Sequence, residues 1–122
     1  MIKLISRLLI LLSWSAFVFI LLLTPMPVSQ GPGPAGFDKV VHIFLFGVLS
    51  FLIIYIFKNT SRILLVFMSA FLMASIYATV LEYLQVFVPG RSNSPLDLLA
   101  GLLGIILGEL IAYVQFVKFK KT

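Results

Sequence analysis

The chain has 122 residues, of which 61% are hydrophobic and only 11% charged, and its formal net charge is +5. Soluble domains average about 25% charged residues, so this composition excludes an ordinary soluble fold and favours a chain that buries its apolar surface in lipid. The lack of cysteine excludes disulfides and thiolate metal sites. The basic residues do not cluster on a soluble face, so we predict no nucleic-acid partner.

Four apolar runs follow one another along the chain, and each approaches the roughly 20 residues needed to cross the hydrocarbon core. They predict transmembrane helices at about 4–24, 38–57, 63–88 and 95–117. Helices are the expected spanning form, because the runs lack the alternating polarity of a membrane barrel. The connections are short, so we predict an all-α membrane protein in which residues 1–122 form one transmembrane domain.

The first run follows Lys3 and Arg7 and therefore resembles a secretory signal peptide. It is long for such a peptide, and no convincing small-x-small cleavage site precedes Gly31. We therefore expect it to remain as the first span. The next segment, residues 24–37, contains four prolines and three glycines, which rule out a continuous helix and indicate a connecting loop.

The basic residues flank the four runs unequally. Only Lys39 and Arg91 flank one side of the predicted bundle. The other side has seven of the nine lysines and arginines, namely Lys3, Arg7, Lys58, Arg62, Lys118, Lys120 and Lys121. The positive-inside rule then places both termini and the turn at 58–62 in the cytoplasm. The segments at 24–37 and 89–95 are predicted to face outward.

Polar side chains gather near the outer ends of the last three runs. Asp38 and His42 lie four residues apart, on one helix face. Glu82 is expected about 9 Å below the outer end of the third run. A carboxylate at that depth needs a partner, and Arg91 or His42 would serve. The candidate binding residues are Asp38, Lys39, His42, Glu82, Gln85, Arg91 and Asp97. His42 and Glu82 are also the candidates for acid–base chemistry.

Several of these residues also have a purely structural interpretation. Asp38 is suited to capping the second helix. The run Ser94-Pro95-Leu96-Asp97 matches a helix start, with Ser94 as the cap, Pro95 in the first turn and Asp97 as the returning carboxylate. Glu109 lies deeper, toward the cytoplasmic side, and the sequence offers it no evident partner.

The fourth run carries small residues at helical spacing. Ala100, Gly104, Gly108 and Ala112 recur every four residues and share one face, which Gly101 widens. A Gly-x-x-x-Gly pair lets another helix approach closely. We interpret the ladder as internal packing against a neighbouring span, and a homodimer face is the alternative.

The predicted outer site favours an anion. The second and fourth helices both begin there, so their positive dipole ends face it, and Lys39 and Arg91 add charge. We therefore expect membrane lipids as partners, together with a phosphate or carboxylate ligand anchored in the outer leaflet. A phospholipid, a lipid-linked wall precursor and an acylated antibiotic all qualify. No ligand spacing supports a metal ion, and we predict neither a metal nor another cofactor.

The order and spacing of the polar residues resemble the signature of the VanZ-like family. The matching motifs are Asp38-Lys39-x-x-His42, Glu82-x-x-Gln85, Pro89-Gly90-Arg91 and Asp97-Leu98-x-x-x-x-x-Gly104, and the resemblance covers residues 37–108. It implies a small multi-pass protein of the bacterial cell membrane. The name-giving member is associated with low-level resistance to teicoplanin, a glycopeptide with a fatty-acyl tail.

The resemblance supplies no reaction, so other classes of function stay open. One is an intramembrane enzyme that modifies a lipid head group, with His42 and Glu82 as acid and base. Another is a small transporter coupled to protons through Glu82. Transporter sites usually lie near the midplane between repeats, whereas this polar cluster is off-centre, so the sequence favours the transporter least.

Overall fold

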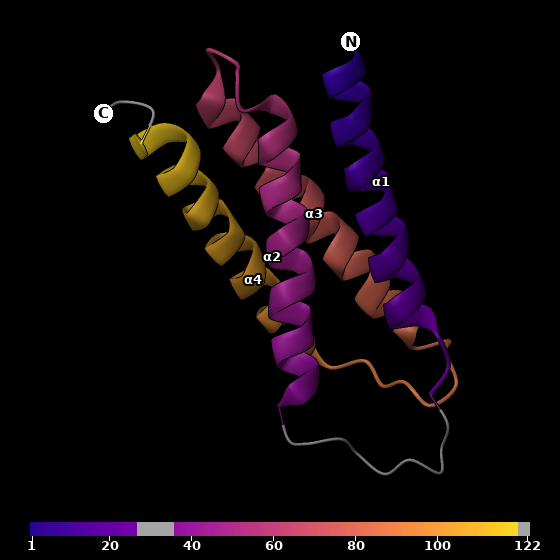
Figure 1. Cartoon of the computed structure of the whole chain (residues 1–122). Helices are drawn as coiled ribbons and strands as arrows, with labels where there is room; N and C mark the ends of the chain where they lie inside the picture. Colours follow the sequence, from indigo (N-terminus) through magenta and orange to yellow (C-terminus); the bar gives the residue numbers. More distant parts are fainter. Residues whose placement is uncertain (27–35, 120–122) are drawn as a thin grey trace.

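The computed structural model describes residues 1–26 and 36–119, and four long helices dominate it (Figure 1). They are α1 (Ile2–Leu23), α2 (Phe37–Phe57), α3 (Ile63–Gln85) and α4 (Pro95–Tyr113), and the π-helix η1 (Val114–Lys118) continues α4. All four are long and apolar enough to cross a membrane. The predicted all-α bundle with four spanning helices is therefore confirmed. Most of the predicted 24–37 loop, and Lys120 and Lys121, lie outside the described residues.

Both chain ends and the α2–α3 turn lie at the same end of the bundle (Figure 1). We call this the inner end, following the predicted topology. The opposite end, where α2 and α4 begin, we call the outer end. α2 and α4 therefore run in the same direction through the bundle, and α1 passes the other way.

Helix α3 ends at Gln85, three residues before the predicted end of the third span. The N–H groups of Val86, Phe87 and Val88 each bond to the carbonyl three residues earlier, at 3.1–3.2 Å. These tight turns replace the last helical bonds, and Pro89 has no N–H to continue the helix. The result is a loop at residues 86–94 that leads across the outer end to α4.

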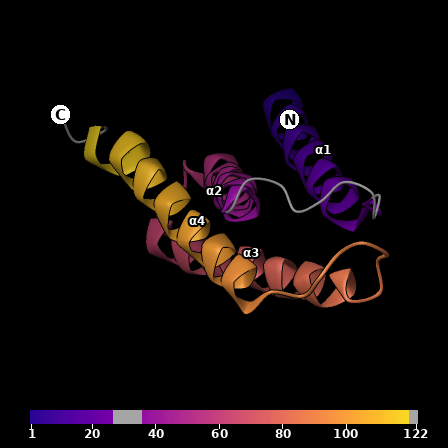
Figure 2. The ribbon, with the colours of Figure 1, turned by 90° about the horizontal axis from the view of Figure 1, so that it is seen from below.

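Helix α2 lies at the centre and contacts the other three helices, with its most extensive contact to α4. Figure 2 shows α2 between α1 and the crossing pair of α3 and α4. The small-residue ladder of α4 makes the close approach to α2. A Cβ at Gly104 would collide with the carbonyl oxygen of Ile43, and one at Gly108 with that of Gly47. These two glycines therefore pack against the backbone of α2 in the same chain.

The rest of the ladder also faces inward. Ala100, Gly101 and Ala112 are buried. Gly101 lies against the ring of Phe46, whose nearest atom would be 3.0 Å from an added Cβ. Small side chains let α2 and α4 pack backbone against backbone, which is how helices associate where lipid offers no hydrophobic driving force.

Helix α1 is the most loosely held of the four, with Val18 and Leu22 as its only buried residues. Two long-range hydrogen bonds attach its middle to the bundle. The indole Nε1–H of Trp14 donates to Leu45 O (3.0 Å), and the Tyr77 hydroxyl donates to Ser15 O (2.7 Å). In the described part of the chain, α1 contacts α2 and α3 but not α4.

Candidate functional site

The centre of the outer polar cluster is a buried pair between α2 and α3. His42 Nε2 lies 3.7 Å from Glu82 Oε2, and the two side chains are 5% and 6% exposed. The other ring nitrogen, Nδ1, lies 2.8 Å from the backbone carbonyl of Asp38. A carbonyl only accepts, so Nδ1 carries a hydrogen and Nε2 is left facing the carboxyl group. Nε2 lies just beyond hydrogen-bond range of Glu82 and has no hydrogen-bond partner among residues 1–26 and 36–119.

This geometry sets two groups that can each carry a proton side by side. A neutral imidazole with its hydrogen on Nδ1 presents a lone pair at Nε2, which would oppose a carboxylate. A hydrogen on Nε2, or one on Glu82, removes that opposition. His42 and Glu82 thus place a buried imidazole beside a buried carboxyl group at the outer end of the bundle.

Glu82 also holds the start of α4. Its Oε1 accepts a hydrogen bond from the backbone N–H of Ser94, the N-cap residue, at 2.6 Å. The sequence suggested that Asp97 would supply that carboxylate as part of a capping box. That prediction was wrong, because Glu82 reaches the cap from the neighbouring helix α3. Ser94 itself makes no side-chain cap bond.

Asp97 instead joins α4 to α2. Its Oδ1 accepts from Lys39 Nζ at 3.2 Å, and the two side chains are 12% and 41% exposed. The pair therefore lies at the rim of the cluster, with a buried carboxylate and a partly exposed ammonium. It is separate from the pair of His42 and Glu82, and together the two pairs tie α2 to α3 and to α4.

Arg91 and Gln85 do not join this cluster, because both turn to the end of α1. Gln85 Nε2 donates to Leu22 O at 3.0 Å. Arg91 donates from Nη2 to Leu21 O at 2.7 Å, and from Nε to Thr24 O at 3.2 Å. The last carbonyls of a helix have no partner within it, and these side chains supply the donors. Of the two partners that the sequence offered Glu82, the structure selects His42 and not Arg91.

The turn that carries Arg91 needs a glycine. Gly90 has φ +78°, and a Cβ there would collide with the carbonyl oxygen of Met26. The backbone also crosses to the end of α1 directly, since Met26 N donates to Pro89 O at 3.2 Å. The left-handed turn and the close approach together exclude other residues. Pro89, Gly90 and Arg91 thus fasten the α3–α4 loop to α1.

Two acidic residues noted in the sequence, Asp38 and Glu109, take no part in the two charged pairs. Asp38 is exposed in the first turn of α2 and makes no cap bond, since Gly36 is the N-cap residue. It contributes its carbonyl to His42 rather than its carboxylate. Glu109, for which the sequence offered no partner, accepts a long hydrogen bond of 3.4 Å from the buried Ser50. That contact lies between α2 and α4, away from the outer cluster.

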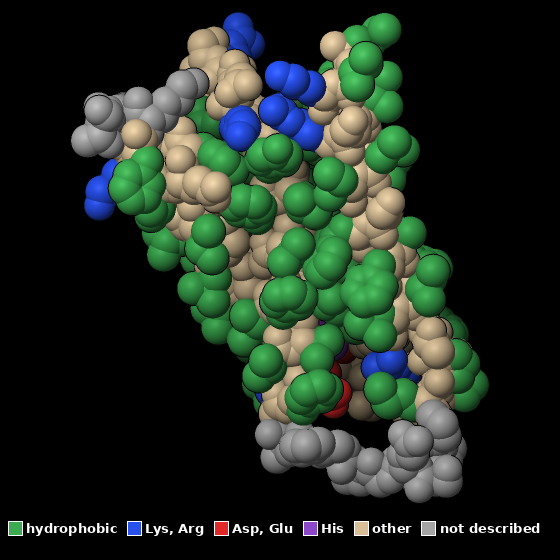
Figure 3. Space-filling view, in the orientation of Figure 1, with side chains coloured by type: hydrophobic (Ala, Val, Ile, Leu, Met, Phe, Trp, Pro, Cys, Tyr) green, Lys and Arg blue, Asp and Glu red, His purple; other side chains and the backbone are tan. Residues whose placement is uncertain are grey.

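The charges divide between the two ends of the molecule. Figure 3 shows most lysine and arginine side chains at the inner end. Red carboxylates and the purple histidine are recessed between hydrophobic side chains toward the outer end. No group of three or more His, Asp or Glu side chains that could hold a metal ion occurs in residues 1–26 and 36–119.

A model of the VanZ/LLP1 family matches residues 2–117, which is nearly the whole chain. The chain belongs to the VanZ/LLP1 family. The comparisons with curated proteins and with solved structures gave no significant match. The family and the four apolar helices together make it a VanZ-like multi-pass membrane protein.

The motifs that suggested the VanZ-like family have two different tasks in the structure. Lys39, His42, Glu82 and Asp97 form the two charged pairs. Gln85 and the turn at 89–91 bind the end of α1. Sequence spacing placed all of these at the outer end but gave no means of separating the tasks.

Other polar contacts were not identified from the sequence. They involve Trp14, Tyr77, Ser50 and the backbone N–H of Ser94. A tryptophan or tyrosine in an apolar run is itself a signal, since its N–H or O–H needs an acceptor when buried. The hydrogen bond from the Ser94 N–H could not be predicted from the sequence, because any residue other than proline would provide the same backbone N–H.

A groove of about 380 Å³ runs between α2 and α4 of this VanZ-like bundle. Its walls are mostly apolar, and Gly47, Gly104 and Gly108 line it at the place where the two backbones approach closely. Lys39, Ile43 and Gly47 are spaced by four residues and so follow one stripe of α2. By that register the Lys39–Asp97 pair stands at the outer mouth of the groove.

Proposed function

We propose that this VanZ-like protein binds an anionic, acylated ligand at the outer leaflet of the bacterial cell membrane. We further propose that it thereby lowers susceptibility to lipoglycopeptides such as teicoplanin. The observation that carries the proposal is the buried pair of His42 and Glu82, in which Nε2 has no hydrogen-bond partner in the part of the chain that the structure describes. A buried polar atom without a partner is costly in lipid, and a ligand that bonds it would remove that cost.

The surroundings of the pair support an anionic head group. An imidazole that carries a hydrogen on Nε2 can donate it to an anionic oxygen. At the rim, the Lys39 ammonium is 41% exposed and keeps donors beyond the one used by Asp97. The N-termini of α2 and α4 both point toward this end, and their dipoles favour negative charge.

The groove between α2 and α4 supports an acyl chain. It is lined mostly by apolar side chains, and its lining residue Ile43 lies one helical turn from Lys39 on α2. A ligand with its head group at this pair could lay its chain along Gly47, Gly104 and Gly108. Head group and tail would then be recognised by adjacent parts of α2 and α4.

The test compares antibiotic susceptibility of a bacterial host that carries wild-type protein, His42→Gln or Glu82→Gln. We expect both substitutions to abolish protection against teicoplanin at normal protein abundance, because each removes one member of the acid–base pair. Glu109→Gln is the matched control, since it removes a carboxylate outside the outer cluster, and it should retain protection. A glycopeptide without the acyl tail should show little difference among these strains.

Two results would contradict the proposal. One is full protection by both outer variants. The other is equal protection against the antibiotics with and without the acyl tail, since the groove would then have no role. Protein abundance in the membrane must be measured in every strain, so that a folding defect is not read as a loss of function.

A second candidate is an enzyme that modifies a lipid head group, and one observation favours it. His42 is oriented through Nδ1 by Asp38 O, as the imidazole of a general base is oriented by a hydrogen-bond partner, and a carboxyl group lies beside its Nε2. Mass analysis of the host's lipids distinguishes enzyme from binder. A lipid species that forms with the wild type but not with His42→Gln favours the enzyme, and unchanged lipids favour the binder.

A further inference from the structure

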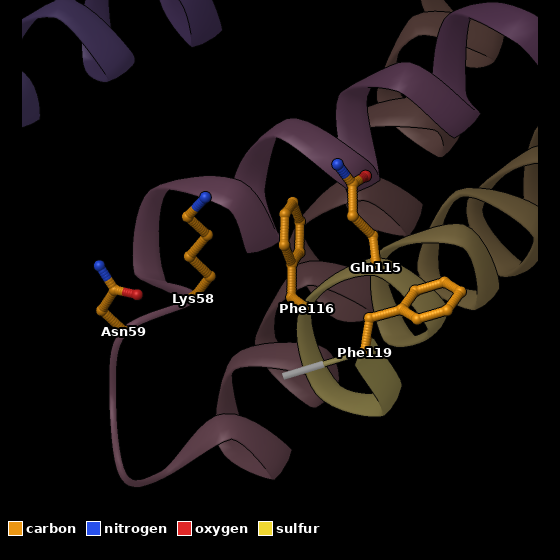
Figure 4. A pocket seen from close by; sticks show the side chains of 5 residues that line it. All are labelled: Lys58, Asn59, Gln115, Phe116 and Phe119. Atoms are coloured by element: carbon orange, nitrogen blue, oxygen red, sulfur yellow. The ribbon is translucent and has the colours of Figure 1, made fainter. Parts of the chain in front are cut away.

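A second cavity lies at the inner end, far from the outer cluster. It has a volume of about 290 Å³ and lies between the α2–α3 turn and η1 (Figure 4). Lys58 and Asn59 line it from the turn, and Gln115 and Phe116 from η1, with Phe119 beside them. The pocket therefore combines one cation, two side-chain amides and aromatic rings.

Aromatic rings hold two cations at this place. Lys58 Nζ lies 4.4 Å from the ring centre of Tyr55 and 4.6 Å from that of Phe116. From α1, the guanidinium carbon of Arg7 lies 4.8 Å from the same Tyr55 ring. Cation–π contacts of this kind fix the position of a charge without neutralising it. Lys58 and Arg7 thus both contact the ring of Tyr55, with Lys58 in the pocket lining and Arg7 beside it on α1.

The π-helical turn shapes the other wall. Helix α4 widens at Val114–Lys118, and both Gln115 and Phe116 belong to this turn. The ring of Phe116 also contacts those of Phe51 and Tyr55, with centres 5.4 and 5.9 Å apart. Wide turns of this kind often occur at functional sites. In Figure 4 the side chains of Lys58, Phe116 and Gln115 rise side by side, with Asn59 next to Lys58.

The inner end has no matching negative charge in the part of the chain that the structure describes. Its five described cations, Lys3, Arg7, Lys58, Arg62 and Lys118, have no carboxylate within ion-pair distance. Both ion pairs of the described residues are at the outer end. Within the described residues, Lys58 and Arg7 therefore have no carboxylate partner, and basic residues near a membrane surface attract anionic lipid head groups.

We propose that this inner pocket binds the head group of an anionic phospholipid. Lys58 and Arg7 attract the phosphate, and the amides of Asn59 and Gln115 bond its oxygens or those of the glycerol. The rings of Tyr55 and Phe116 keep the two cations in place when the site is empty. The site is independent of the outer cluster and does not rest on the function proposed above.

The test is the binding of single lipids to the purified full-length protein, followed by native mass spectrometry in detergent. Phosphatidylglycerol should bind the wild type more tightly than phosphatidylcholine. Lys58→Gln should weaken phosphatidylglycerol binding about fivefold, which is typical of one basic residue at a membrane surface. Arg62→Gln is the control, because it removes an equal charge at the same end but outside this pocket, and it should change binding less than twofold.

A second variant guards against a folding defect in Lys58→Gln. Asn59 is exposed in the turn, so Asn59→Ala removes one amide without disturbing the rings, and it should weaken binding about threefold. Equal losses in Lys58→Gln and Arg62→Gln would overturn the proposal, because general charge attraction would then suffice. Saturable binding of glycerol 3-phosphate as tight as that of the lipid would overturn the assignment to a lipid.

Discussion

The two ends of this bundle use charged residues in opposite ways. At the outer end, Lys39, His42, Glu82 and Asp97 pair with one another across helices, and three of the four are buried. At the inner end, cations such as Arg7 and Lys58 meet aromatic rings and, within the described residues, no carboxylate. Outer charges therefore hold helices together, whereas these inner charges contact aromatic rings. Loss of a charge should consequently have different effects at the two ends.

The largest effect is expected at Glu82. Glu82→Ala strands His42 and leaves the Ser94 N–H without its acceptor, so it should lower the free energy of unfolding by about 3–5 kcal/mol. At the inner end, Arg62→Ala should change it by less than about 0.5 kcal/mol. The measurement is unfolding in detergent micelles. Comparable losses at the two ends would remove the contrast between them.

A double-mutant cycle sharpens this result. Glu82 and His42 should be coupled by about 1–3 kcal/mol, because they face each other across the cluster. Glu82 and Arg91 should give nearly additive losses, since Arg91 binds the carbonyls of α1 instead. Strong coupling of Glu82 to Arg91 would mean that the arginine leaves α1 and joins the cluster.

The apolar middle that joins the two ends should show an intermediate effect. Gly108→Leu forces a side chain against the backbone of Gly47, so it should destabilise the protein by about 1–3 kcal/mol or more. Leu107→Ile, at a 41% exposed position one residue away, is the matched control and should be tolerated. If both substitutions are equally harmless, the glycine contact with α2 does not contribute to stability.

The smallest effect on stability is expected from the substitutions that test which end faces the cytoplasm. Single cysteines at Asn93, in the outer loop, and at Thr60, in the α2–α3 turn, are both exposed. In intact cells an impermeant thiol reagent should label position 93 and spare position 60, since the basic residues favour a cytoplasmic inner end. Labelling of position 60 would reverse the assignment of the two ends.

Much of the architecture followed from patterns along the chain. The four apolar runs gave four helices, and Ser94 and Pro95 marked the start of α4. The end of α3 was missed by three residues, because residues 86–88 continue the apolar run while their backbone forms tight turns. Hydropathy indicates which residues can lie in lipid, but it does not indicate where the hydrogen bonding of a helix ends.

The site was harder to predict, because spacing fixes depth and face but not partners. Glu82 had two available partners, and helix packing brought His42 to it and took Arg91 to α1. The capping pattern at Asp97 matched local preference, yet Lys39 and Glu82 reached the same positions from other helices. Tertiary contacts decided each case, and a single sequence does not contain them.

The bonds at the end of α1 also impose an order on how the protein is made. The carbonyls of Leu21, Leu22 and Thr24 take their donors from residues 63 to 70 positions later in the chain. Synthesis proceeds from the N-terminus, so α1 is complete long before those donors exist. Until then, water or lipid head groups must supply the hydrogen bonds to the carbonyls at its outer end. Arrival of the turn at 89–91 supplies the Arg91 donors, and a ribosome that stops earlier leaves the carbonyls of Leu21 and Thr24 without them.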